Sequence, residues 1–153
     1  MREIDVQFAT NDECPSETQI QHWALTALVQ QKKNGALVIR VVDETEMTSL
    51  NYQFRKKNKP TNVLSFACQL PPSLKGDILG DIVICASVVA QEAKEQQKPI
   101  AAHWAHMVVH GVLHLLGHDH EKDDEATVME SEEVMILREL GFSDPYRVEH
   151  CDE

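Results

Sequence analysis

The hydrophobic and polar positions of the chain follow two periods, one typical of strands and the other of helices. Ile4, Val6 and Phe8 alternate with polar residues, which predicts a half-buried strand near the start. Runs rich in Val, Ile, Leu and Phe predict three more strands, over residues 36–42, 63–66 and 80–85. All the predicted strands therefore lie before residue 86.

Five stretches are predicted to be helices. The first begins after Ser16, which can cap a helix, and ends at Asn34-Gly35. The other four cover residues 44–54, 86–97, 100–116 and 125–140, while Pro71-Pro72 predicts a loop. Strands come early and helices fill the last third, so we predict one α+β domain over residues 1–153. In it, one small mixed β-sheet of about four strands packs with about five helices.

Four histidines lie on the predicted helix 100–116 and share one face of it: His103, His106, His110 and His114. His110 and His114 are one helical turn apart, so their imidazoles can converge on a single metal ion. His103 and His106 lie beyond this turn. We expect these two to pack, or, for His106 in particular, to contact and orient a ligand.

A third ligand follows the helix. Gly117 can end the helix in a left-handed turn, which lets the chain double back and bring His120 to the same ion. The resulting spacing, H-x-x-x-H-x-x-G-x-x-H, is that of the metal helix of metzincin proteases. Those proteases place a Glu general base directly after the first His, where this chain has Gly111. The missing Glu counts against peptide hydrolysis.

Three neutral imidazoles with an open fourth position are typical of a catalytic metal site, because the ion then lowers the pKa of a bound water toward ~7. We expect one divalent ion, zinc first, although nickel, copper or iron also accept such ligands. Asp119 can orient a ligand histidine through its second ring nitrogen, or be an ordinary exposed loop residue. The sequence leaves the direction of His118 open.

The charge of the chain is unevenly distributed. The formal net charge is −11, but residues 1–118 hold 11 Lys/Arg and 12 Asp/Glu, whereas residues 119–153 hold 3 and 13. A basic run survives within this acidic chain, made of Arg55, Lys56, Lys57 and Lys59. Such a run is usually a solvated turn, but it can also bind phosphates.

The composition also predicts a compartment. The four cysteines are far apart, form no CxxC pair and follow no secretory leader, so we expect free thiols in the cytoplasm. No apolar run approaches the roughly 20 residues that cross a bilayer, so we expect a soluble protein that has no membrane partner.

Several motifs together resemble one known family. They are HGVLHLLGHDH at 110–120, PTNVLSF at 60–66, GDILGDIVI at 76–84, and Arg55 within NYQFRKKNKPTN. The chain resembles, over nearly its whole length, the YbeY family of bacterial metal-dependent endoribonucleases.

The resemblance implies an endoribonuclease specific for single-stranded RNA that acts in ribosomal RNA maturation, notably at the 3′ end of 16S RNA, and in ribosome quality control. It implies a zinc-like ion on His110, His114 and His120, and an arginine essential for activity at Arg55. We accordingly expect Arg55 to hold the scissile phosphate. Lys56, Lys57 and Lys59 would make weaker contacts along the RNA. The small ribosomal subunit or its proteins are the expected partners, and DNA is not expected.

Alternatives remain at this level. The chain can instead be a zincin-type metalloprotease, or a ribosome-assembly factor whose metal only holds the fold. For an endoribonuclease, either water or the 2′-hydroxyl can attack the phosphate. The acidic segment 119–139 suggests a further hypothesis, that Glu130, Glu132 and Glu133 help to dock a basic ribosomal protein.

Overall fold

A computed structural model of the chain describes residues 1–118 and 123–146. The strands are β1 (Arg2–Phe8), β2 (Gly35–Val42), β3 (Val63–Ala67) and β4 (Ile78–Cys85). The helices of the described part are α1 (Glu17–Gln30), α2 (Glu44–Arg55), α3 (Pro72–Lys75), α4 (Ala86–Glu95), α5 (Ile100–Leu115) and α6 (Asp123–Glu139).

The four strands form one mixed sheet in the order β1-β2-β4-β3. β1, β2 and β4 run parallel, and β3 pairs antiparallel with β4 at one edge. In that pairing Ser65 lies opposite Ile82, and Phe66 lies opposite Asp81. The predicted α+β class with one mixed four-stranded sheet is therefore confirmed.

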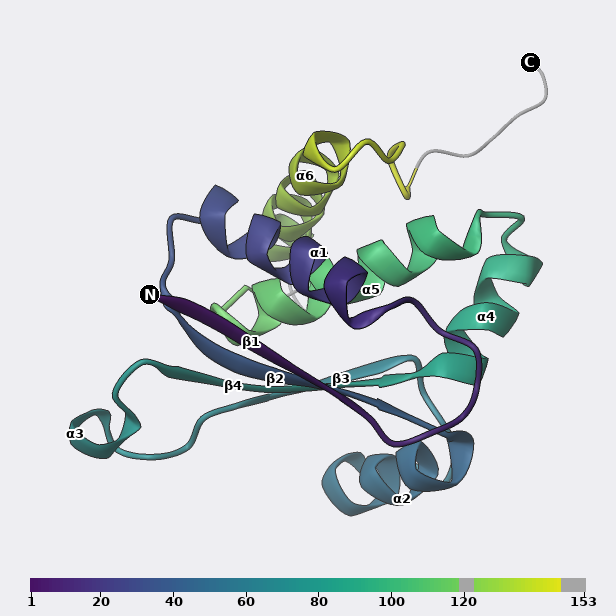
Figure 1. Cartoon of the computed structure of the whole chain (residues 1–153), viewed down its shortest axis with the longest axis horizontal. Helices are drawn as coiled ribbons and strands as arrows, with labels where there is room; N and C mark the ends of the chain where they lie inside the picture. The colour runs from purple at the N-terminus through teal and green to yellow at the C-terminus, as the bar shows by residue number, and fades with distance from the viewer. Residues whose placement is uncertain (119–122, 147–153) are drawn as a thin grey trace.

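Helices cover the two faces of the sheet unequally. Figure 1 shows α1 and α5 on one face with α6 outside them, and α2 alone against the other. The larger core lies under α1 and α5, where Ile39, Ile82 and Trp104 are fully buried. A smaller core lies under α2, around Met47 and Val83. The edge strand β3 thus has a large helical layer on one side and a single helix on the other.

The helix starts follow from local sequence chemistry. Ser16 accepts a hydrogen bond from the backbone N–H of Gln19, whose side chain caps Ser16 in return, as a capping box requires. Asp43 caps α2 by accepting a hydrogen bond from the backbone N–H of Glu46. Both predicted helix starts are confirmed.

One local prediction is wrong. The loop expected at Pro71-Pro72 contains the single-turn helix α3. Pro is well tolerated at the first position of a helix, because the backbone N–H at that position has no acceptor within the helix. Among the described residues, no helix has the length and apolar character needed to span a bilayer.

Candidate active site

His110 and His114 project from one face of α5 into a cavity. They lie one turn apart on a largely buried helix, with ring centroids separated by 4.7 Å and ring planes inclined by 71°. Both rings line a cavity of about 700 Å³ at the edge of the sheet. The two histidines that the sequence pairs are therefore brought together at an open site.

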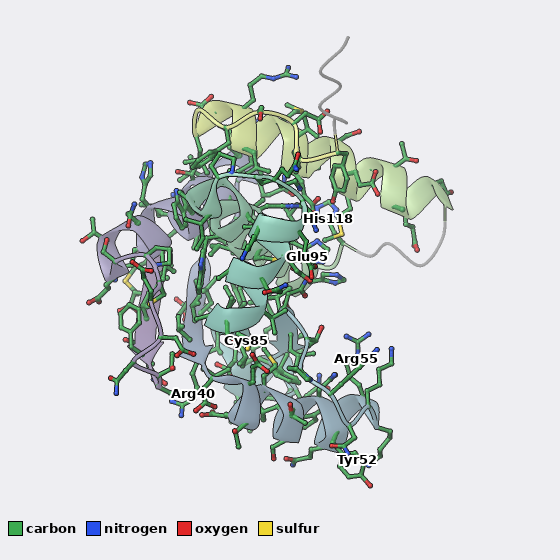
Figure 2. The ribbon with its side chains drawn as sticks, turned by 90° about the vertical axis from the view of Figure 1, so that its right-hand side faces the viewer. Arg40, Tyr52, Arg55, Cys85, Glu95 and His118 are labelled. Atoms are coloured by element: carbon green, nitrogen blue, oxygen red, sulfur yellow. The ribbon has the colours of Figure 1, made fainter. Side chains whose placement is uncertain are left out.

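The other walls of the cavity come from β3 and from the end of α2. Residues 61–66 line it along the edge strand, and Phe54 and Arg55 line it from α2. Figure 2 shows Arg55 and Tyr52 on opposite sides of the end of α2, with Arg55 directed back toward the body of the protein. Arg55 thus shares one cavity with His110 and His114, although it comes from the opposite face of the sheet.

Ser65 fixes α5 to the edge strand. Its hydroxyl donates a hydrogen bond to the carbonyl oxygen of Gly111 (3.2 Å), next to His110. The hydroxyl of Ser65 therefore satisfies a backbone carbonyl of α5 and links that helix to β3.

The close packing of α5 on β4 explains why a Gly, and not a Glu, follows His110. A Cβ built on Gly111 would lie 2.8 Å from Cγ2 of Ile82, which is fully buried in the sheet. The backbone of α5 therefore approaches β4 too closely for any larger side chain. The protease general base has no room at this position.

We predict that Gly111→Ala destabilises the fold despite the better helix propensity of Ala. Overpacking a core costs ~1–3 kcal/mol, which exceeds the ~1 kcal/mol that Ala gains over Gly in a helix. Urea unfolding would measure the loss. Ile82→Ala removes the opposing atoms. The double variant should therefore lose less unfolding free energy than the sum of the losses of the two single variants. Strict additivity would contradict the close contact.

A buried carboxylate lies behind the histidines. Glu133 of α6 is 0% exposed, and its Oε2 lies 2.6 Å from Nδ1 of His110. Its Oε1 lies 3.0 Å from Nε2 of His106 and accepts a hydrogen bond from the hydroxyl of Tyr146. Because an ionised carboxylate only accepts hydrogen bonds, both ring nitrogens must carry their protons toward Glu133.

The electrostatics support an ionised Glu133. Burial alone would raise the pKa of Glu133, but the hydrogen bonds and charges of His106 and His110 outweigh it and hold that pKa at about 2. Burial and the same carboxylate raise the pKa of Tyr146, so its hydroxyl stays protonated and donates. Glu133 is therefore a permanent acceptor at neutral pH.

Two arrangements of a metal ion fit these side chains. His106, His110 and Glu133 offer ligand atoms within 4.8 Å of one another, so this group could bind a metal ion. The same atoms, however, already pair at hydrogen-bond distances of 2.6 Å and 3.0 Å. A carboxylate on Nδ1 of His110 is also the usual partner of a histidine that binds metal through Nε2. The donor set therefore suits an ion on the cavity side of His110 as well.

His103 and His118 contact partners other than Glu133. Nε2 of His103 lies 2.8 Å from Glu92, and burial lowers the pKa of His103, although Glu92 partly opposes this. Gly117 has a φ of 100°, so the predicted turn with positive φ is present, and beyond it Nε2 of His118 lies 2.9 Å from the side-chain oxygen of Gln31, the residue after α1. Asp119 and His120 lie outside the described residues.

The basic run divides into unequal parts. Arg55 lines the cavity, whereas Lys56, Lys57 and Lys59 are exposed around the end of α2 and are not among the residues that line it. Lys56 adopts the left-handed conformation that ends α2. Only Arg55 is therefore placed at the histidines.

The sequence-based interpretation of Glu133 as a surface acid is wrong. Glu133 is fully buried, whereas Glu130 is exposed and Glu132 accepts a hydrogen bond from Gln31 (2.6 Å). Only the last two can belong to a docking surface. A signal was present, because Glu133 lies three or four residues from the buried Met129, Ile136 and Leu137 and so falls on the apolar stripe of α6.

Comparisons with known proteins agree with this architecture. The chain is similar to TM1509 from Thermotoga maritima, whose solution structure matches with a TM-score of 0.63 and 25% sequence identity, over 94% of this chain and 99% of that one. A family profile described as Endoribonuclease YbeY matches residues 5–141. That match spans every strand except the start of β1, together with all of α1–α6. The chain therefore belongs to the YbeY endoribonuclease family.

Proposed function

We propose that this chain is a metal-dependent endoribonuclease that cuts single-stranded RNA in ribosomal RNA processing, with 16S RNA 3′-end maturation as its expected task. His110, His114 and His120 would hold one divalent ion, zinc or a similar transition metal. The observation that carries the proposal is the single cavity that His110, His114 and Arg55 line together.

The histidines supply the metal side of the site. With Nδ1 of His110 held by Glu133, Nε2 is the nitrogen through which this ring would bind an ion. His106 completes the support from behind, since it shares Glu133 with His110. When bound, a divalent ion supplies a Lewis acid that activates water or polarises a phosphate oxygen.

Arg55 supplies the phosphate side. Cleavage of a phosphodiester builds negative charge on the non-bridging oxygens, and a planar guanidinium can grip two of them at once. Lys56, Lys57 and Lys59 follow Arg55 in the chain and are exposed, and there they would contact neighbouring phosphates. The cationic end of α2 thus favours a polyanion although the chain as a whole is acidic.

The setting of the reaction follows from the proposed substrate. We expect the protein to act in the cytoplasm on ribosomal RNA of the small subunit, without a membrane partner and without activity on DNA. On α6, the exposed Glu130 and the half-buried Glu132 could contact a basic ribosomal protein.

One incubation series tests the proposal. Zinc-loaded protein is mixed separately with single-stranded RNA, the matching RNA duplex, single-stranded DNA and casein, each with and without a chelator. We expect chelator-sensitive cleavage of the single-stranded RNA alone. Cleavage of casein would favour the protease alternative, which the contact between Gly111 and Ile82 opposes. Bound metal without any cleavage would favour a non-catalytic assembly factor.

A further inference from the structure

Two phenylalanines form part of the cavity wall beside Arg55. Phe54 precedes Arg55 at the end of α2, and Phe66 lies in β3; their ring centroids are 4.8 Å apart and their planes are inclined by 56°. Both rings line the cavity that also contains His110 and His114. An aromatic surface therefore adjoins the proposed phosphate-binding and metal-binding groups.

The two rings are held differently. Phe66 is partly buried and packs against the smaller core under α2, so it has a firm support. Phe54 rests on Phe66 and remains 55% exposed. An isolated exposed apolar residue is common on a protein surface, but this one makes a tilted ring contact with the partly buried Phe66 and lines a cavity that Arg55 also lines. Tyr52 is equally exposed, at 57%, yet does not line the cavity.

The residues around Phe54 and Phe66 indicate what kind of ligand could bind over the two rings. The cavity volume of about 700 Å³ lies in the range that holds small organic groups. Arg55 and the adjacent Lys56 and Lys57 favour an occupant that carries phosphates. Unpaired bases of RNA stack on aromatic side chains, whereas bases inside a duplex stay stacked on one another. A nucleotide has both of the required groups, a phosphate and a flat apolar base.

We propose that Phe54, supported by Phe66, is a stacking platform for one unpaired base of RNA next to the phosphate held by Arg55. This inference rests on the proposed function and adds a reason for single-strand specificity. Stacking accepts every base because each has a π face, so the platform selects unpaired nucleotides without selecting a sequence.

Binding of a short fluorescein-labelled single-stranded RNA, followed by anisotropy with chelator present so that no RNA is consumed, tests the platform. Phe54→Ala should weaken RNA binding about tenfold. Phe54→Leu should weaken it nearly as much, because leucine keeps the apolar bulk but lacks the aromatic ring on which a base stacks. Phe54→Trp should bind like the wild type. Tyr52→Ala is the matched control, with comparable exposure on the same helix, and should bind like the wild type.

A set of RNAs that each lack one base locates the contact. One such abasic position should weaken binding to the wild type but not to Phe54→Ala, because the missing base and the missing ring would remove the same interaction. Phe54 is mostly exposed, so these variants should keep the melting temperature of the wild type.

The outcomes separate the two levels of the proposal. Two results would show that the stacking platform is wrong while the proposed function stands, provided that the wild type cleaves RNA. One is that Phe54→Leu binds RNA as tightly as the wild type. The other is that every abasic position weakens RNA binding equally in the wild type and in Phe54→Ala. If the wild type neither binds nor cleaves RNA, the proposed function itself fails.

Discussion

Replacing Arg55 by Ala is expected to lower kcat for RNA cleavage by about 10²- to 10³-fold, the usual cost of losing one group that stabilises transition-state charge. Arg55 lines the same cavity as His110 and His114 and projects from the end of α2. The melting temperature and the affinity for zinc should stay as in the wild type, because Arg55 is exposed and lies on a different element from the histidines. Single-turnover cleavage of single-stranded RNA would measure the loss.

Two further variants separate geometry from charge. Arg55→Lys keeps the charge but loses the planar fork, so it should recover only part of the lost rate. Lys57→Ala removes a neighbouring charge outside the cavity lining and should mainly weaken binding, by a few-fold, with kcat unchanged. Equal losses in Arg55→Ala and Lys57→Ala would show that the basic run acts as a general electrostatic surface and that Arg55 has no special role.

Replacing Glu133 by Gln is expected to weaken zinc binding by about 10- to 100-fold, as the loss of a carboxylate behind a ligand histidine commonly does. Glu133 is acceptor-only, so it fixes the proton of His110 on Nδ1 and presents Nε2 to the cavity. A Gln amide can donate as well as accept, so it no longer enforces that tautomer. Competition with a chromophoric chelator would measure the affinity without any assay of activity.

The matched control for Glu133 lies one residue earlier. Glu132→Gln changes the same charge on the same helix, but Glu132 contacts Gln31, the residue after α1, so zinc affinity should stay as in the wild type. Glu133→Ala should in addition destabilise the protein, because His106, His110 and Tyr146 would each lose a buried acceptor. If Glu133→Gln bound zinc as tightly as Glu132→Gln, the positioning role would be refuted.

The elements governed by local rules could be predicted from the sequence. Strand-type residue patterns placed the four strands, and the cap at Ser16 placed the start of α1 to within a residue or two. The pairing of His110 with His114 was also predictable, since residues one helical turn apart must share a face. These features depend only on neighbours in sequence.

The rest of the site depends on contacts between distant segments. Charge composition suggested a solvated position for Glu133, although its place on the apolar stripe of α6 was a signal for burial. Only the packing of α6 on α5 shows that it lies beside His106 and His110. Nothing in the local sequence brings Tyr146 to the same carboxylate. Likewise, Phe54 and Phe66 meet only because α2 and β3 pack together.

The contacts among Ser65, Gly111 and Ile82 form a closed loop between a helix and two strands. Ser65 is paired with Ile82 across the sheet, Ile82 limits how closely Gly111 can approach, and Gly111 accepts the hydrogen bond of Ser65. The first contact sets the alignment of β3, the second the height of α5 above the sheet, and the third the rotation of α5 about its own axis. The direction from which His110 enters the cavity is therefore constrained by contacts within the protein, so little orientational freedom would be lost if an ion bound there.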